Sequence, residues 1–411
     1  MSGPPDVGDR DPRRWRMLGL LATAELLGMS LWFAASAVAT QLAGRWGLGP
    51  SQTAWLTTIV QLGFVCGTAV AALLNLADLL PSRWFFAVAA LAGAAANAAL
   101  VVTDGFALAL VFRFVTGFSL AGVYPPAMKM ASTWFRARRG LAIGTVVGAL
   151  TVGKATPYLV HALPAAGPRV VILVASACAV VAALLIAGLY VDGPYPFPPR
   201  PFAWSLVRTV AERREWRLAT SGYLGHMFEL YSFWTWIPLF LAASVAAQRG
   251  GGSSVDSSPG LVSVVAFGTI AVGGLGCVWG GLAADARGRE RLVMLAMALS
   301  GACSLLIPIA FGRSLWVVGS LAWVWGFFVI ADSAQFSALV TEAVPPHAVG
   351  TALTVQTSLG FLLTMVSIQL IPPLVTMVGW RWVFPVLALG PMFGIASIRR
   401  LVAFRTVRTV V

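Results

Sequence analysis

Five ionisable side chains interrupt long apolar stretches of this 411-residue chain: Glu25, Arg113, Lys154, Glu229 and Asp332. A charge in the middle of a bilayer costs roughly 2.5–3.5 kcal/mol to insert, so it usually faces a polar cavity or an oppositely charged partner. Burial and coupling to other charges also bring such groups toward titration near neutral pH. The chemistry expected of them is proton uptake and release, or pairing with a charged solute.

His226 stands three residues before Glu229, on the same face of a helix. Three interpretations remain open for this pair: two metal ligands, a hydrogen bond that packs helices, or two groups that exchange a proton. No further ligand stands nearby in sequence, which disfavours a metal, and no cofactor motif is present. We predict that Glu229 carries a proton that His226 accepts or returns. Glu25 is the competing carrier, and Asp332 belongs to the same set.

Hydrophobic helices are the elements that must hold these groups. Hydrophobic residues make up 58% of the chain and charged residues 10%, and the mean hydropathy of +0.84 excludes a soluble domain. A run of about 20 apolar residues spans a bilayer as a helix. The sequence therefore predicts an all-α integral membrane protein with twelve transmembrane helices, at residues 16–38, 52–75, 84–103, 105–128, 140–162, 169–191, 217–242, 260–284, 292–311, 314–339, 348–373 and 380–402.

The net charge of +13 is distributed unevenly between the two predicted faces of the membrane. One face has only five basic residues in its loops: Arg45, Arg169, Arg249, Arg313 and Arg381. Most others lie in the tails and in the opposite loops, and loops rich in Lys and Arg stay in the cytoplasm. Both termini are predicted to be cytoplasmic, in a multi-pass protein of the cell (inner) membrane. The basic excess reflects topology and not binding to nucleic acid.

A short turn at residues 281–291 joins two predicted spans and carries glycines, one carboxylate and several arginines. Its pattern, Gly-x3-Asp-x2-Gly-Arg-x-Arg, resembles the loop 8–9 motif of the major facilitator superfamily. A partial copy near residue 80 keeps the aspartate and one arginine. The alternative is an ordinary basic turn on the cytoplasmic side. The resemblance implies a gating role for Asp78, Arg83, Gly281, Asp285, Gly288 and Arg289.

One sequence pattern occurs in both halves of the chain. Glu25 has Trp32 seven residues on, and Glu229 has Trp236 seven residues on, as expected of two duplicated halves. The resemblance implies a fold of two pseudo-symmetric six-helix bundles that functions as a monomer. The predicted parts are a cytoplasmic tail (1–15), a bundle (16–191), a cytoplasmic linker (192–216) with an amphipathic helix, a second bundle (217–403) and a C-terminal tail (404–411).

Two further motifs bear on function. Arg113, Gly117 and Ala121 resemble the helix 4 motif of the superfamily, where the arginine takes part in coupling; pairing with Glu25 to hold two helices is the alternative. The glycines of predicted helix 5 resemble the nitrate/nitrite and cyanate porters. However, predicted helix 11 keeps only Gly360 in its body, and predicted helices 2 and 8 lack an intramembrane arginine, which disfavours nitrate itself.

We predict a secondary active transporter, and not an enzyme, that moves a small organic or inorganic anion in symport with protons by alternating access. Proton-driven efflux of many substrates is the alternative. A membrane enzyme would need a converging nucleophile or metal set, and a receptor would usually bring a soluble domain; neither is found. The partners expected are a small solute, protons and lipid. The predicted substrate-binding residues are Trp32, Arg113, Tyr124, Lys154, Tyr231 and Trp236.

Overall fold

Helices make up nearly the whole of the molecule. The computed structural model describes residues 11–136, 138–164, 166–195, 202–249 and 259–410. Within these residues, ten helical stretches are long and apolar enough to cross a membrane by length and composition. In such segments every backbone amide and carbonyl must be satisfied internally, which an apolar helix does without help from water. The all-α prediction is confirmed.

Before the short connecting helix α10 (Trp204–Glu212), the chain forms the N-terminal helices, which are α1 (Arg13–Met29), η2 (Ser36–Val38), α2 (Ala39–Trp46), α3 (Pro50–Leu73), α4 (Leu76–Leu79), α5 (Ser82–Ala99), η3 (Leu100–Val102), α6 (Phe106–Leu120), α7 (Tyr124–Trp134), α8 (Arg139–His161) and α9 (Pro168–Leu189). The C-terminal helices follow: α11 (Arg214–Arg249), α12 (Pro259–Ala271), α13 (Gly273–Arg287), α14 (Arg289–Ala310), α15 (Leu315–Ala331), α16 (Ser333–Glu342), η4 (Pro346–Ala348), α17 (Val349–Val383), η5 (Phe384–Ala388) and α18 (Leu389–Val410).

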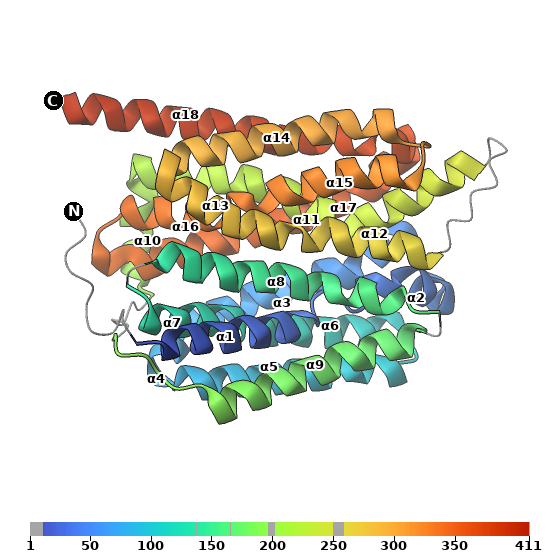
Figure 1. The fold of residues 1–411 in the computed structure, drawn as a ribbon, viewed down its shortest axis with the longest axis horizontal. Coiled ribbons are helices and arrows are strands. Elements are labelled where there is room, and N and C mark those ends of the chain that lie inside the picture. The colour runs from blue at the N-terminus through green and yellow to red at the C-terminus, as the bar shows by residue number, and fades with distance from the viewer. Residues whose placement is uncertain (1–10, 137, 165, 196–201, 250–258, 411) are drawn as a thin grey trace.

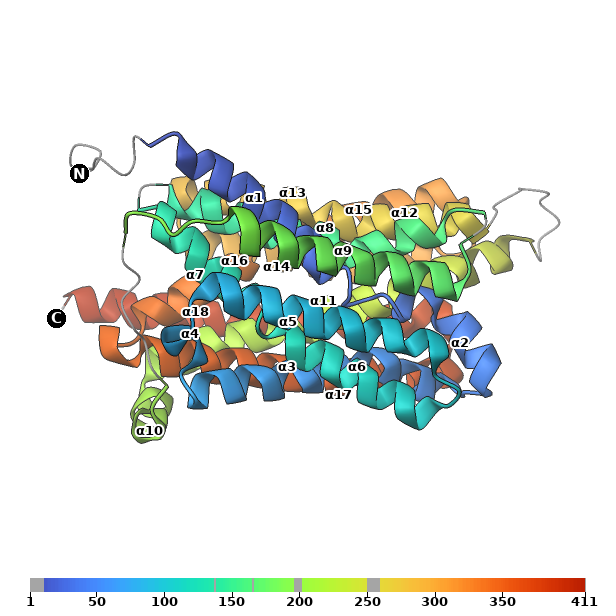
Figure 2. The same cartoon turned by 90° about the horizontal axis from the view of Figure 1, so that it is seen from below.

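The two sets of helices lie side by side, with their long axes roughly parallel (Figure 1). Contacts between the sets run mainly through α3 with α17, and through α8 with α12, α13 and α16. Figure 2 shows α3 lying beside α17. In Figure 1, α1 begins and α18 ends at the same end of the molecule, which we call the terminal end; α2 lies at the opposite end, the α2 end.

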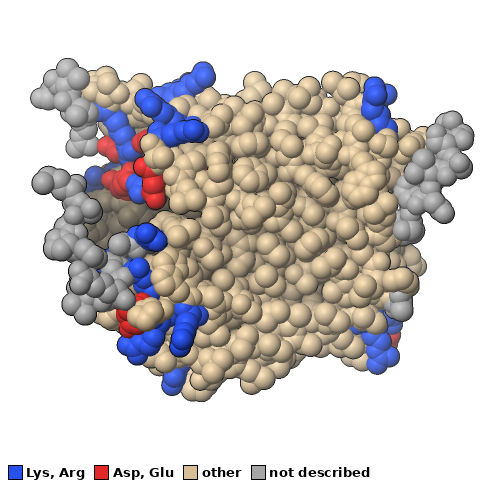
Figure 3. Space-filling model, viewed as in Figure 1, with Lys and Arg blue, Asp and Glu red and all other residues tan. Residues whose placement is uncertain are grey.

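Charged side chains gather at the two ends of the molecule. On the face in Figure 3 a broad band without Lys, Arg, Asp or Glu separates them, and more of the basic residues lie at the terminal end. One network of ion pairs within the C-terminal helices stands at that end: Arg405 contacts Glu290 at 2.6 Å and Glu342 at 3.6 Å, and Glu342 also pairs with Arg289. The uncharged band is the surface that suits lipid.

The first predicted span is not one continuous helix. The sequence predicted an unbroken helix over 16–38, but α1 ends at Met29 and the chain turns before the short helix η2 begins at Ser36. The Arg113 guanidinium stabilises the break, because it donates hydrogen bonds to the carbonyl of Trp32 and to that of Leu31, which also accepts one from the backbone amide of Ala34. The apolar pattern could not reveal this compensation, which comes from another helix.

Three other predicted spans are also interrupted. The span at 105–128 breaks between α6 and α7, just before Pro125 and Pro126. The span at 314–339 breaks at Asp332, between α15 and α16, and the span at 260–284 breaks between α12 and α13. In contrast, α18 remains helical to Val410, where the sequence predicted a tail from residue 404.

Candidate functional site

Lys154 occupies an aromatic cage where the two sets of helices meet. The side chain is 1% exposed and lies on α8. Its ammonium donates a hydrogen bond to the hydroxyl of Tyr231 on α11, and lies 4.0 Å from the ring centroid of Trp32 and 5.5 Å from that of Trp234. Ring faces attract a cation, and more strongly where water is excluded. We call Trp32, Tyr231 and Trp234 the cage.

Further rings extend the cage across the two sets of helices. The Trp32 ring lies 5.3 Å from that of Phe64 on α3 and 5.8 Å from that of Phe361 on α17, centroid to centroid. The rings of Phe64 and Phe361 are 4.7 Å apart. The ammonium of Lys154 is therefore enclosed in an apolar layer, and no carboxylate of the described residues lies within 4 Å of it.

Glu25, on α1, is a fully buried carboxylate close to that layer. Neither of its oxygens has a hydrogen-bond partner among the described residues. The carboxylate interacts electrostatically with the Lys154 ammonium and with the hydroxyl of Tyr124, and Cys277 belongs to the same group of interacting side chains. An unpartnered buried charge is costly, whereas a carboxyl that binds a proton in place is not. Glu25 and Lys154 are therefore two buried ionisable groups that influence each other without a direct ion pair.

Arg113 lies away from this layer, although it was predicted to bind substrate. Its guanidinium is fully buried and donates to the carbonyls of Leu31, Trp32 and Leu56 and to the side chain of Asn97. All of these acceptors belong to the N-terminal helices, and none of them is Glu25. The contacts fasten the broken part of the first span to α3, α5 and α6.

Replacing Arg113 by methionine is expected to destabilise the protein, because the buried carbonyl of Trp32 loses its donor at about 1–3 kcal/mol and those of Leu31 and Leu56 lose one of their donors. The midpoint of thermal unfolding in detergent should fall, and Arg113→Lys should restore part of the loss. Ligand affinity of the folded fraction should stay close to that of the wild type. Normal unfolding combined with lost ligand binding would instead put Arg113 in the substrate site.

Glu229 lies in a different environment from Glu25. Its two oxygens accept hydrogen bonds from the indole of Trp325 and the hydroxyl of Ser300, both at 2.8 Å. These partners stand on α15 and α14, so the carboxylate joins three C-terminal helices. No contact with His226 accompanies these two hydrogen bonds.

His226 instead faces the break in the span that contains Asp332. Its Nδ1 lies 2.9 Å from Oδ1 of Asp332, and both side chains are 2% exposed. The rings of Tyr223 and Phe336 pack around the imidazole. The sequence placed His226 and Glu229 in one pair, whereas the structure separates them into two contacts.

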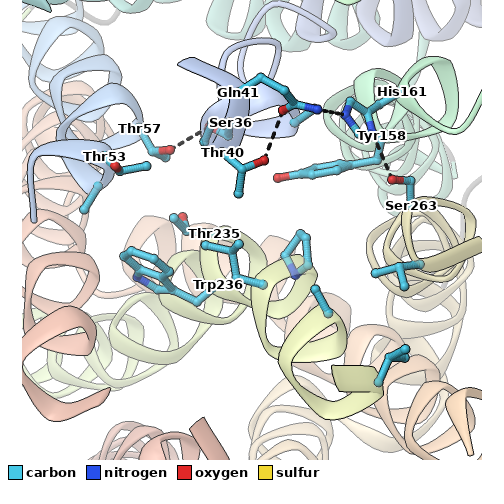
Figure 4. Close-up of a pocket in the computed structure, with 18 of the residues that line it drawn as sticks. Ser36, Thr40, Gln41, Thr53, Thr57, Tyr158, His161, Thr235, Trp236 and Ser263 are labelled. Carbon is cyan, nitrogen blue, oxygen red and sulfur yellow. Dashed lines mark hydrogen bonds between the residues drawn. The ribbon is translucent and has the colours of Figure 1, made fainter. Parts of the chain in front are cut away.

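A cavity of about 480 Å³ lies between the two sets of helices on the side of the α2 end. We call it the chamber. Figure 4 shows Tyr158 reaching into it from α8, with Thr235 and Trp236 on the facing α11. Trp236, a predicted substrate residue, donates its indole hydrogen to the carbonyl of Ile368. Among the described residues that line the chamber there is no Lys, Arg, Asp or Glu.

One polar chain crosses the wall of the chamber. Nε2 of His161 lies 2.7 Å from the amide nitrogen of Gln41, and its Nδ1 lies 3.0 Å from the hydroxyl of Ser263. Gln41 and His161 belong to the N-terminal helices and Ser263 to α12. These residues, together with Tyr158, were missed as site residues. Only the spacing of Tyr158, four residues after Lys154 on one helix face, was a usable signal.

At the terminal end the two sets of helices are in close contact. A Cβ added at Gly148 would lie 2.9 Å from the carbonyl oxygen of Gly274, and one at Gly144 would lie 3.2 Å from that of Cys277. The backbones of α8 and α13 therefore touch through glycines along this seam. The two sets of helices therefore pack tightly at the terminal end, whereas the chamber separates them toward the α2 end.

Part of the predicted gating motif lies at the same end of the molecule as these glycine contacts. The Asp285 carboxylate faces Gly140 near the N-terminus of α8, where a Cβ would lie 3.5 Å from Oδ2. A negative charge is favoured at a helix N-terminus. Gly281 also faces Gly140 across the seam. Gly288 has a φ of +87°, which favours glycine at this turn.

Arg289 and Arg83, two other members of the predicted motif, make different contacts. Arg289 pairs with Glu342 within the C-terminal helices. Arg83 is exposed, with its guanidinium against the neighbouring ring of Trp84. Asp78 lies on α4, and its side chain is outside what the structure describes.

Comparison with known proteins identifies the family. Residues 20–368 match the Major Facilitator Superfamily. A crystal structure of the nucleoside transporter NupG is similar in fold, with a TM-score of 0.69 over 94% of this chain and 99% of that chain, at 13% sequence identity. No curated protein matches the sequence. No finding favours the nitrate or cyanate porters within the superfamily. This chain belongs to the major facilitator superfamily of membrane transporters.

Proposed function

We propose that the protein is a proton-coupled secondary transporter for a small solute that bears a negative charge. The observation that carries this proposal is the Lys154 ammonium, held between the two sets of helices by Tyr231 and ring faces, with no carboxylate in contact. A buried cation between the two sets of helices that lacks an ion-pair partner among the described residues attracts an anion strongly in a low dielectric. Glu25, a buried carboxylate without a hydrogen-bond partner among the described residues, is the proposed proton acceptor.

Charge balance explains why an anion and a proton would move together. With Lys154 protonated and Glu25 ionised, the empty site carries no net charge. An anion bound to Lys154 alone adds one negative charge that the apolar surroundings disfavour. A proton on Glu25 restores neutrality, and only then do the two sets of helices reorient at low cost. The result is symport of one proton with one monovalent anion.

Glu25 replaces Glu229 as the proposed proton carrier. Glu229 is already satisfied by Ser300 and Trp325, and protonation would weaken both contacts. We assign Glu229 a structural role within the C-terminal helices, and Arg113 a structural role within the N-terminal helices. The contact between His226 and Asp332 lies at the break between α15 and α16, so we assign this pair to helix packing there.

Purified protein in proteoliposomes tests the function directly. A screen by thermal unfolding against inorganic anions, carboxylates and organic cations would select ligands, which are then tested for uptake. We expect an anion to accumulate inside the proteoliposomes when an inward proton gradient is imposed. A protonophore should abolish this accumulation. Stabilisation and transport of organic cations alone would contradict the proposal and favour multisubstrate efflux.

We also propose twelve crossings with both termini in the cytoplasm. The first crossing consists of α1, the turn that follows it and η2. The last two crossings lie within one 62-residue apolar stretch and are separated by the kink at Gly379 (φ +73°). The terminal end, rich in Lys and Arg, is then the cytoplasmic face, and α10 lies on the inner leaflet.

An impermeant maleimide applied to intact cells tests this topology. A cysteine placed at Ser253, in the loop between α11 and α12, should be labelled from outside, whereas one placed at Ala211 on α10 should be protected until the cells are broken. If only Ala211→Cys were labelled on intact cells, the protein would have the opposite topology.

A further inference from the structure

The chamber and the Lys154 cage lie one helical turn apart along α8 and α11. Tyr158 follows Lys154 by four residues on α8, and Thr235 follows Tyr231 by four residues on α11. Four residues make one helical turn on the same face, about 6 Å along the axis. The Phe33 ring bridges the layers, at 6.3 Å from the ring of Tyr158 and 6.4 Å from that of Trp234, centroid to centroid. The cage therefore lies about one helical turn beyond the chamber, although its own residues are not among those that line the cavity. We call the cage the floor.

Two hydroxyls in the chamber have no hydrogen-bond partner: Tyr158, whose side chain is 3% exposed, and Thr235 on the facing helix. The other polar side chains that line the cavity are already engaged with one another or with backbone carbonyls: Ser36, Thr40, Gln41, Thr53, Thr57, His161, Trp236 and Ser263. Buried polar groups in proteins are nearly always satisfied, so two that converge on one cavity indicate a ligand with matching polar groups.

The chemistry of the two layers differs. The floor offers a cation and aromatic faces, whereas the chamber offers hydroxyls and ring surfaces without any formally charged side chain. A volume of about 480 Å³ lies within the range of small-molecule sites. An inorganic anion on Lys154 would fill the floor and leave both hydroxyls unsatisfied.

We infer that the transported solute is a hydroxylated organic anion, whose charged group lies on Lys154 and whose uncharged body hydrogen-bonds to Tyr158 and Thr235 in the chamber. This inference rests on the proposed function. The ligand carries a hydroxyl or carbonyl about one helical turn, ~6 Å, from its charge. Tyr158 and Thr235 lie on opposite sets of helices and contact the solute from both sides. They select for its uncharged polar groups, whereas Lys154 selects for its negative charge.

Binding of matched probes to the purified full-length protein tests this inference. Gluconate and hexanoate are both six-carbon monocarboxylates, but only gluconate has hydroxyls, and glucose has the hydroxyls without the charge. Calorimetric titration should show that gluconate binds more tightly than hexanoate and that glucose binds weakly. Tyr158→Phe and Thr235→Val should each reduce the preference for gluconate about three- to tenfold and leave the affinity for hexanoate unchanged.

The control is Thr156→Val, on the same helix as Tyr158, because its hydroxyl bonds the carbonyl of Val152 in its own helix; it should leave the preference intact. Equal affinity for gluconate and hexanoate, or a small inorganic anion as the only ligand, would overturn this inference. The proposed function would still stand in either case, provided that anion binding depends on Lys154. Glucose binding as tightly as gluconate, with Lys154→Gln without effect, would overturn both.

Discussion

Replacing Lys154 by glutamine is expected to weaken anion binding at least about 100-fold, because truncating one member of a buried charge pair typically costs 2–5 kcal/mol. Glutamine keeps the length and polarity of the side chain but removes the charge. Lys154→Arg should keep part of the affinity, since the planar guanidinium retains the charge but does not fit a cage shaped for a compact ammonium. Equilibrium binding and initial uptake rates in proteoliposomes measure both effects.

Lys129 supplies the matched control, because the chain has only these two lysines. It lies on α7, outside the cage, so Lys129→Gln should bind and transport at the wild-type level. Both variants should fold, and Lys154→Gln is expected to unfold at an equal or higher temperature because it removes a buried charge. Anion affinity that survives Lys154→Gln in well-folded protein would refute the role proposed for Lys154.

The helical character of the protein was predictable because each apolar run carries its own signal. The turn at 281–291 was equally predictable. Gly288 has a positive φ, which favours glycine, and Asp285 lies near the N-terminus of α8. The break after Met29 was not predictable. It depends on hydrogen bonds from Arg113, which stands some eighty residues away in sequence.

The two glutamates show the limit of sequence reasoning most clearly. Glu25 and Glu229 have the same local pattern, yet Ser300 and Trp325 satisfy one and no described group bonds the other. The partners lie on helices that the repeat does not specify. Similarly, the cage around Lys154 combines rings from both sets of helices, so its composition follows from packing and not from spacing.

Replacing Glu25 by glutamine is expected to abolish accumulation driven by a proton gradient, because glutamine permanently mimics the protonated carboxyl. The loaded carrier should still reorient, so exchange of labelled for unlabelled solute across the membrane should persist. In proteoliposomes the ratio of internal to external solute should fall to about one under an imposed pH gradient, with counterflow close to wild type.

Glu229→Gln is the control, since it makes the same chemical change at the corresponding position of the other half. It should leave accumulation intact and lower the stability of the C-terminal helices by about 1–3 kcal/mol, through weakened hydrogen bonds with Ser300 and Trp325. The opposite pattern, in which Glu229→Gln removes accumulation and Glu25→Gln preserves it, would return the coupling role to α11. It would also make the satisfied carboxylate, rather than the unpartnered one, the group that titrates during transport.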